Sequence, residues 1–269
     1  MAENILEKIA EKTRIRIEDK KAHLSLEDLK EITYEKIHVE GYTHPSFFEA
    51  LKKPGMSYIC EVKKASPSKG IIVEDFPYLE IAKDYEKAGA SAISVLTEPS
   101  YFLGSYQYLQ EIVQEVSIPV LRKDFTIDEY MIYEAAYLGA SAILLIVSLL
   151  RDEELKRYIE LTEELGMDAL VEAHNEVEIH RGVLQGAKII GVNNRDLKTF
   201  TVDPMNSVNL RKNAPSEVLF VSESGIKTAK DIELLRENQI DAVLIGETLM
   251  RAEDKKSMLK DLNGGPINR

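Results

Sequence analysis

The segment CEVKKASPSKG, residues 60–70, places an acid and a base at the end of an apolar run and then turns sharply. The residues before it have the pattern of a buried strand, in which alternate side chains share a face, so Glu61 and Lys63 should point the same way. A buried carboxylate and ammonium are costly unless they pair or meet an ionic ligand. The turn that follows offers hydroxyls and backbone N–H groups suited to an anion. We therefore expect a polar site here, with a purely structural Glu61–Lys63 pair as the alternative.

The composition narrows the class of protein. The 269 residues, 44% hydrophobic and 30% charged, suffice to bury a large core. A net charge of -12 argues against a nucleic-acid or anionic-membrane surface, because both require a basic face, so any anionic ligand must meet a local basic cluster. The single Cys60 excludes an internal disulfide, and the longest apolar run, residues 142–150, is too short to span a bilayer. With no signal-peptide pattern at its start, the chain is expected to be cytoplasmic, and its protein partners stay unknown.

Residues 1–45 differ from the rest of the chain because they are rich in charge and carry apolar residues at helical spacing. One stripe begins at Ile5, Leu6 and Ile9, and a second begins at Leu26, after Ser25 as a helix cap. The pattern predicts two short helices docked on a larger body, and a disordered tail is the alternative. We place the body of the protein in residues 46–269.

The remainder repeats one unit. GASAISVL at 89–96 recurs as GASAILLI at 139–146, and looser copies follow. Each copy reads as a glycine ending a helix, a short turn and a buried strand. The predicted strands lie near 57–63, 91–96, 119–123, 141–147, 168–173, 188–193, 218–222 and 241–245.

Amphipathic stretches of about ten to fifteen residues lie between these strands, for example at 78–88, 128–138 and 152–165. Apolar strands that alternate with helices indicate a parallel sheet covered by helices. Eight such units predict an α/β fold, a closed (βα)8 TIM barrel with an N-terminal helical extension. An open doubly wound sheet is the alternative, but its glycine-rich dinucleotide fingerprint is missing.

Polar residues gather where the predicted strands end, whereas the strand beginnings hold little beyond Gly, Ala, Ser and Asp. The active sites of barrel enzymes lie at this carboxyl end, so the asymmetry predicts an enzyme. The residues concerned are Glu61 and Lys63, Thr97 and Glu98, Lys123 and Asp124, Glu172 and His174, Asn193 and Arg195, residues 222–225, and Gly246 and Glu247.

Seven strings carry a family resemblance: EVKKASPSKG at 61–70, LTEPSYFLGS at 96–105, LRKDF at 121–125, LVEAHN at 170–175, GVNNRDLKTF at 191–200, SESGI at 222–226 and LIGETLMR at 244–251. Together they resemble indole-3-glycerol phosphate synthase over nearly the whole chain, including an extension before the barrel. The resemblance implies closure of the indole ring of 1-(2-carboxyphenylamino)-1-deoxyribulose 5-phosphate, with loss of carbon dioxide and water, in tryptophan biosynthesis. It implies no cofactor and no metal.

Ring closure needs a general acid at the ribulose carbonyl, and dehydration needs a base and an acid. By resemblance Lys123 is the acid and Glu172 one dehydration partner, with Lys63 and Glu61 nearby and Asn193 orienting them. How these groups divide the acid and base roles stays open. The structural alternatives are a Lys123 salt bridge with Asp124 and a pairing of Glu172 with Arg195.

Substrate binding should have three parts. The phosphate is expected at the backbone N–H groups of Gly225, Gly246 and Glu247, where this fold often binds phosphate. Ser66 and Lys63 would complete that pocket, although Lys63 could instead reach the anthranilate carboxylate. By resemblance the aromatic ring meets Phe102, Phe125, Leu144 and Leu197, for which core packing is the alternative. The residues left for the sugar hydroxyls and for orienting catalytic groups are Asn193, Arg195, Glu223 and Ser224.

Other functions are disfavoured. Glu172 and His174 share a strand face like a metal pair, but no third His or Cys ligand occupies a comparable position. No serine lies in a G-x-S-x-G motif. The rivals are another phosphate-binding barrel, such as an isomerase of the same pathway, and a barrel that has lost activity and serves as a scaffold. Loss of activity should show as loss of Lys123 or Glu172, and both are present.

Overall fold

The protein is a closed barrel of parallel strands with a helical extension. The computed structural model describes residues 5–196 and 199–264, in which eight parallel strands close in the order β1-β10-β9-β8-β7-β6-β5-β4. These strands are β1 (Ser57–Val62), β4 (Ala92–Leu96), β5 (Val120–Lys123), β6 (Ala142–Ile146), β7 (Asp168–Ala173), β8 (Ile189–Asn193), β9 (Leu219–Glu223) and β10 (Ala242–Ile245). Each predicted strand is therefore confirmed, with ends that differ by about a residue.

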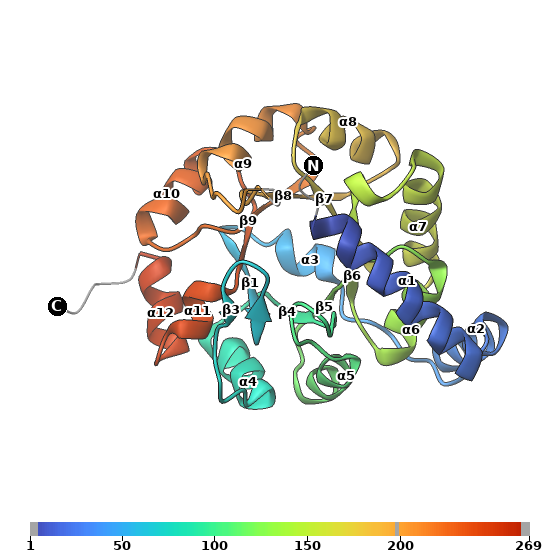
Figure 1. Ribbon diagram of the computed structural model, residues 1–269. Coiled ribbons are helices and arrows are strands. Elements are labelled where there is room, and N and C mark those ends of the chain that lie inside the picture. Colours follow the sequence, from blue (N-terminus) through green and yellow to red (C-terminus); the bar gives the residue numbers. More distant parts are fainter. Residues whose placement is uncertain (1–4, 197–198, 265–269) are drawn as a thin grey trace.

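Helices surround the barrel as an outer ring (Figure 1). The ring and its neighbouring short helices are α4 (Tyr78–Ala88), α5 (Tyr106–Glu115), α6 (Glu129–Leu138), α7 (Asp152–Glu164), α8 (Glu176–Leu184), α9 (Met205–Leu210), α10 (Ala229–Glu237), α11 (Glu247–Arg251) and α12 (Lys255–Leu262), with 3-10 turns η2 (Val147–Leu149) and η3 (Arg211–Asn213). The repeated glycines act as expected: Gly89 and Gly139 end α4 and α6 with left-handed φ values of 95° and 90°.

Two apolar clusters hold the barrel together. Outward-facing strand residues such as Cys60 and Ile143 pack against the ring of helices, while inward-facing residues such as Ile59 and Leu121 fill the barrel interior. Short helix α3 (Phe47–Leu51) closes the amino-terminal end, where Phe47 and Leu51 join the interior cluster. The barrel is thus packed at its base, and only the carboxyl end is left for a site.

The extension contains helices α1 (Ile5–His23) and α2 (Leu26–Tyr34), followed by the π-helix η1 (Glu35–Val39). The expectation of two short helices was wrong for the first, because Thr13 and Ile17 continue the buried stripe of Leu6 and Ile9 over 19 residues. Ser25 caps α2 as predicted, since its side chain accepts a hydrogen bond from the N–H of Asp28.

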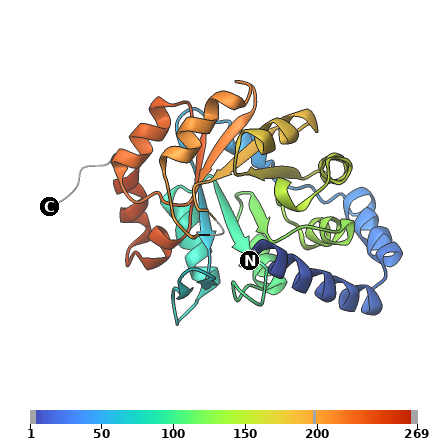
Figure 2. The same cartoon turned by 45° about the horizontal axis from the view of Figure 1, so that its top comes forward.

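The extension is docked on the barrel. Figures 1 and 2 show α1 crossing the face of the barrel from a start near its centre, with α2 outside the helical ring beside α6. Leu6 and Ile9 belong to the interior cluster of the barrel, and the hydroxyl of Thr33 on α2 donates to the carbonyl of Tyr133 on α6 at 3.4 Å. Helices α1 and α2 therefore both contact the barrel.

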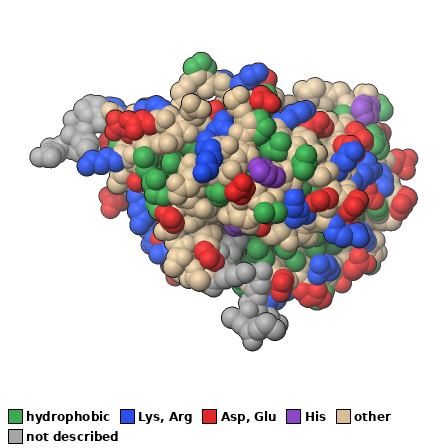
Figure 3. Space-filling view, turned by 90° about the horizontal axis from the view of Figure 1, so that it is seen from above, with side chains coloured by type: hydrophobic (Ala, Val, Ile, Leu, Met, Phe, Trp, Pro, Cys, Tyr) green, Lys and Arg blue, Asp and Glu red, His purple; other side chains and the backbone are tan. Residues whose placement is uncertain are grey.

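Charge and apolar surface are mixed on the outside. Over the face in Figure 3, acidic and basic side chains alternate with apolar ones. No helix in residues 5–196 and 199–264 is both long and apolar enough to cross a membrane.

Cys60 lies on β1 and its side chain is fully buried against the helices. This burial raises the pKa of its thiol.

Candidate active site

A cavity of about 820 Å³ opens at the carboxyl ends of the strands. The predicted site residues within the described part of the chain all line it: Glu61, Lys63, Ser66, Phe102, Lys123, Phe125, Leu144, Glu172, Asn193, Arg195, Glu223, Ser224, Gly225, Gly246 and Glu247. Leu197 lies outside the described residues. These residues therefore come from separate parts of the sequence to the wall of one cavity.

Strand alternation explains why these side chains converge. On β1, β5 and β7 an apolar inward-facing residue is followed two positions later by an ionisable one near the carboxyl end of the strand: Ile59 by Glu61, Leu121 by Lys123 and Leu170 by Glu172. Because parallel strands end at the same rim, the polar residues form one layer above the apolar interior.

Lys123 is at the centre of this layer. Its ammonium lies 2.8 Å from Glu223 Oε2 and 3.6 Å from Glu172 Oε2, and its side chain is 12% exposed. Burial would lower the pKa of Lys123, but Glu223, Glu172 and Glu61 together raise it above its ordinary value. The lysine is therefore fully protonated near neutral pH, and its partner is not the adjacent Asp124 proposed as the structural alternative.

Glu223, the partner of Lys123, is harder to ionise than an ordinary glutamate. Burial raises the pKa of this carboxyl to about 7, with Lys123 lowering it and Glu172 and Glu61 raising it. Gly191 on β8 makes room for it, because a Cβ added at Gly191 would lie 2.3 Å from Glu223 Oε1. Glu223 is thus able to change protonation state in the neutral range.

Glu172 contacts a cation on each side. Its Oε2 faces Lys123, and its Oε1 lies 3.3 Å from Nε2 of His174. Burial would raise the pKa of Glu172, but His174, Lys123 and Asn193 lower it to about 2. Arg195 instead donates to the carbonyl of Phe200 at 3.3 Å, so the alternative pairing of Glu172 with Arg195 is not formed.

Glu61 and Lys63 form a close ion pair on the opposite wall, as their shared strand face predicted. Gly246 at the end of β10 approaches this pair closely. A Cβ added at Gly246 would lie 2.3 Å from Glu61 Oε1 and 2.8 Å from Lys63 Nζ. The glycine is therefore required for the pair to keep its position.

The loop after β1 folds back as a small hairpin. Strands β2 (Ala65–Ser66) and β3 (Gly70–Ile71) are antiparallel, and Ser66 lines the cavity together with Lys69 at the turn. The turn predicted from ASPS therefore lies beside Lys63 at the cavity edge.

The loops after β9 and β10 contribute residues with unusual backbone conformations to the cavity wall. Ser224 and Gly225 both have left-handed φ values, 68° and 85°, and the carbonyl of Ser224 accepts a hydrogen bond from Asn194 Nδ2 at 3.0 Å. A serine in this conformation is strained, and such strain gathers at functional sites. Glu247 follows Gly246 and pairs with Arg251 at 3.1 Å and Lys69 at 3.6 Å. Its negative charge is therefore compensated by these two cations.

An aromatic wall faces the ionisable layer. The rings of Phe102 and Phe125 have centroids 6.1 Å apart with an interplanar angle of 39°. Leu144 is 3% exposed, so it is both a core residue and a lining residue. An aromatic ligand could pack here without meeting a charged group.

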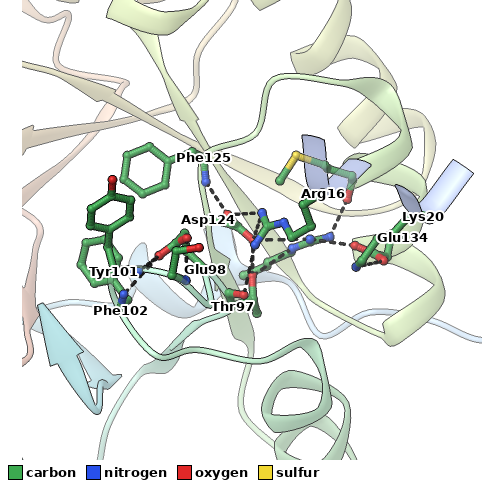
Figure 4. Close-up of polar contacts among 12 residues, drawn as sticks. Arg16, Lys20, Thr97, Glu98, Tyr101, Phe102, Asp124, Phe125 and Glu134 are labelled. Atoms are coloured by element: carbon green, nitrogen blue, oxygen red, sulfur yellow. Dashed lines mark hydrogen bonds and ion pairs between the residues drawn. The ribbon is translucent and has the colours of Figure 1, made fainter. Parts of the chain in front are cut away.

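Two buried carboxylates fix this wall and connect it to the extension (Figure 4). Glu98 accepts hydrogen bonds from the backbone N–H groups of Ser100, Tyr101 and Phe102 at 2.7–3.1 Å, which shapes the loop that carries Phe102. Both carboxylate oxygens of Asp124 accept from one nitrogen, Nη2, of Arg16 on α1, at 2.8 and 2.9 Å.

Asp124 has further partners on the barrel itself. It accepts from Thr97 Oγ1 at 2.7 Å and from the N–H of Phe125 at 2.8 Å. One carboxylate thus ties helix α1 to the ends of β4 and β5.

The sequence did not predict every lining residue. Ile5, Leu6 and Ile9 of α1 line the cavity, whereas their spacing in the sequence predicts only that the helix docks. Three further cations line the cavity together with the loops after β9 and β10: Lys69, Lys227 and Arg251. Arg251 could have been predicted from the sequence, because it lies four residues after Glu247 and so falls on the same face of a helix.

No group of three or more His, Cys, Asp or Glu side chains that could hold a metal ion is found in residues 5–196 and 199–264. The chemistry that the described side chains supply directly is proton transfer, beside an apolar wall and loops rich in backbone donors.

Comparison with known proteins agrees with this geometry. The family model for indole-3-glycerol phosphate synthase matches residues 6–262. The indole-3-glycerol phosphate synthase of Ruminiclostridium cellulolyticum is 54% identical over 97% of this chain and 99% of its own length. That of Endomicrobium trichonymphae is 53% identical over 96% of this chain and 99% of its own. The chain belongs to the indole-3-glycerol phosphate synthase family.

Indole-3-glycerol phosphate synthase is a carboxy-lyase of tryptophan biosynthesis, and this chain catalyses that reaction: ring closure, decarboxylation and dehydration of the carboxyphenylamino sugar phosphate. Solved structures show the fold alone. A 3-hexulose-6-phosphate synthase aligns with a TM-score of 0.64 at 14% identity, covering 78% of this chain and 99% of its own. A chain of the tryptophan synthase complex of Pyrococcus furiosus aligns with a TM-score of 0.58 at 14% identity, covering 77% and 97%.

Proposed function

We propose that Lys123 is the general acid of ring closure and Glu172 the base of dehydration. The observation that carries this assignment is the position of the Lys123 ammonium, which lies in the cavity wall, 3.6 Å from an ionised Glu172 carboxylate. Attack of the aromatic carbon on the ribulose carbonyl places negative charge on the carbonyl oxygen, and the Lys123 ammonium protonates it. Loss of carbon dioxide restores the aromatic ring, after which a proton and the hydroxyl leave as water.

Dehydration needs a group that takes the proton and a group that delivers one to the departing hydroxyl. The ionised Glu172 suits the first role, because its pKa of about 2 keeps it unprotonated near neutral pH. The Glu61–Lys63 pair lies on the opposite wall of the same cavity, where it supplies the second. Asn193 contacts Glu172, and Glu223 contacts Lys123, so both orient the acid and base.

The substrate phosphate binds, in this proposal, to backbone N–H groups of Gly225, Gly246 and Glu247, with Ser66 and Lys63 at the edge. Lys69 and Arg251 favour this orientation because they add positive charge on that side and offset Glu247. The anthranilate ring then packs on Phe102, Phe125 and Leu144. Arg195 and Ser224, between these regions, meet the sugar hydroxyls.

Separating the chemical steps tests the acid and base assignments. With substrate labelled in the carboxyl group, carbon dioxide release reports ring closure, and indole fluorescence reports dehydration. Lys123→Ala should lose both signals together. Glu172→Gln should lose indole fluorescence by at least ~10²-fold while carbon dioxide release falls less. Equal loss of both signals in Glu172→Gln would contradict a role confined to dehydration.

We propose further that residues 1–45 form a lid unit distinct from the barrel of residues 46–269, and that the enzyme acts in the cytoplasm without a metal. The net charge of -12 and the unpaired Cys60 support that location. Cell fractionation tests the location. Treatment with EDTA tests the metal-free reaction, which would be overturned if activity fell and returned with Zn²⁺ or Mg²⁺.

A further inference from the structure

His174 lies beside the base and has no role in the scheme above. It follows β7 directly, two residues after Glu172, so strand alternation turns both side chains toward the same side. The imidazole is only 20% exposed. A residue this close to Glu172 can act on the reaction through that carboxylate.

Both ring nitrogens of His174 face carboxylates. Nδ1 lies within hydrogen-bond distance of Glu178 Oε2, at 3.2 Å, and Nε2 lies 3.3 Å from Glu172 Oε1, an ion-pair contact without an aligned hydrogen bond. A neutral imidazole has one nitrogen without a hydrogen, and its lone pair would face a carboxylate oxygen. The geometry therefore calls for the doubly protonated ring, an imidazolium between two acids.

The outer carboxylate is itself fixed by the start of helix α8. Glu178 Oε2 also accepts the backbone N–H of His174 at 2.8 Å, and its Oε1 accepts from Asn175 Nδ2 at 2.8 Å. Asn175 caps the same helix through the N–H of Glu178. The ring orientation is thus set by a helix terminus and does not depend on a mobile side chain.

We propose that His174 is a positioning residue for Glu172, which it holds as an ionised carboxylate between its own imidazolium and the Lys123 ammonium. The inference rests on the proposed role of Glu172 as a base.

The charged groups around the pair agree with this arrangement. Glu172 faces two cations, His174 and Lys123, and Glu223 of β9 competes with it for Lys123. His174 faces two carboxylates, those of Glu172 and Glu178. Burial would lower the pKa of His174, but the two carboxylates raise it to about 10. Glu61 already pairs with Lys63, but Lys123 alone would have to balance both Glu172 and Glu223. The second cation therefore lets Glu172 stay ionised while Glu223 keeps a pKa of about 7.

The pH dependence of turnover tests the proposal. His174→Gln removes the cation, so the pKa of the fully buried Glu172 should rise from about 2 by roughly three to four units. The acidic limb of kcat/KM should then enter the range from about pH 5 to about pH 9, with a roughly twofold to tenfold loss at the acidic end that shrinks toward the alkaline end. Glu178→Gln should move the limb the same way by less.

Asp152→Asn is the matched control. It removes the 2.7 Å contact of Asp152 with Arg181 on the same helix α8 without touching Glu172, and it should leave the profile unchanged. Circular dichroism and thermal melting check that each variant is folded. A His174→Gln enzyme with an unshifted limb, or with the same loss at every pH, would overturn the proposal.

Glu172→Gln, measured in the same series, separates the two proposals. If Glu172→Gln is inactive and His174→Gln is unshifted, only the role of His174 fails. If Glu172→Gln keeps its turnover, the assignment of the base fails and the inference about His174 fails with it.

Discussion

The two sides of the cavity are built by different means. The proton-transfer side consists of side chains on strands, with Lys123 12% exposed and held by Glu223 and Glu172. The side proposed to bind phosphate consists of loop backbone at Gly225 and Gly246, and its charged side chains are more open; Lys69 is 45% exposed and Arg251 51%. The contrast indicates that chemistry is controlled by buried charges in fixed positions, whereas binding depends on the space beside the backbone. The two sides should therefore fail differently when they are mutated.

The largest effect is expected on the proton-transfer side. Lys123→Ala should lower kcat by at least ~10²-fold with the fold intact, because water cannot replace a buried general acid. Steady-state indole fluorescence measures the rate, and circular dichroism measures the fold. Lys69→Met, which removes an exposed cation from the other side, should affect KM much more than kcat. More than a tenth of the parent activity in Lys123→Ala would refute the assignment.

On the phosphate side, Gly246→Val should nearly abolish competition by inorganic phosphate or sulfate. The new side chain would block the backbone and displace the Glu61–Lys63 pair, whose atoms lie within 3.1 Å of the added Cβ. Lys63→Met should only weaken the competition, because the backbone donors remain. The inhibition constant of phosphate measures both effects, and equal constants for Gly246→Val and the parent would disprove a phosphate site here.

Deleting residues 1–40 should weaken substrate binding and open the site to water while the barrel stays folded, because Leu6 and Ile9 roof the cavity. Steady-state kinetics and thermal melting report the two properties separately. Unchanged KM and kcat would show that the extension is no lid.

A single substitution can refine this test. Arg16→Met removes the cation that contacts both oxygens of the buried Asp124 and should lower the free energy of unfolding by about 3 kcal/mol. Arg14→Met removes an exposed pair with Glu11 on the same helix and should have almost no effect on stability. Chemical denaturation of the two variants compares them directly, and equal stabilities would argue against Arg16 as the anchor.

The smallest effect concerns pH. Burial would raise the pKa of Asp124, but Arg16 and Arg122 lower it, so the folded pKa lies below the unfolded value. Its stabilisation is therefore present above about pH 4 and is lost as the pH falls through the folded pKa. Asp124→Asn should have a lower Tm near neutral pH and a smaller loss of Tm on acidification. If the two Tm curves run parallel, Asp124 is not a source of the acid sensitivity.

The sequence predicted the strands well because each contains an apolar run, and several follow a glycine that ends a helix, as at Gly89 and Gly139. It predicted Lys123 and Glu172 because ionisable residues at the ends of barrel strands have few structural uses. It could not predict the partners, since the contact of Glu223 with Lys123 joins residues 100 positions apart. The same limit applies to Arg16 and Asp124, which are 108 positions apart and meet only because α1 crosses the mouth of the barrel.

The buried Cys60 makes it practical to test whether the proposed lid, residues 1–45, moves. The thiolate is the reactive form of cysteine, and burial raises the pKa of this thiol and also removes it from contact with reagents. A cysteine introduced at an exposed site on α1, such as position 14, would therefore be alkylated selectively in the folded enzyme. A fluorophore attached there would show in real time whether the extension opens and closes. Cys60 itself would not need to be replaced.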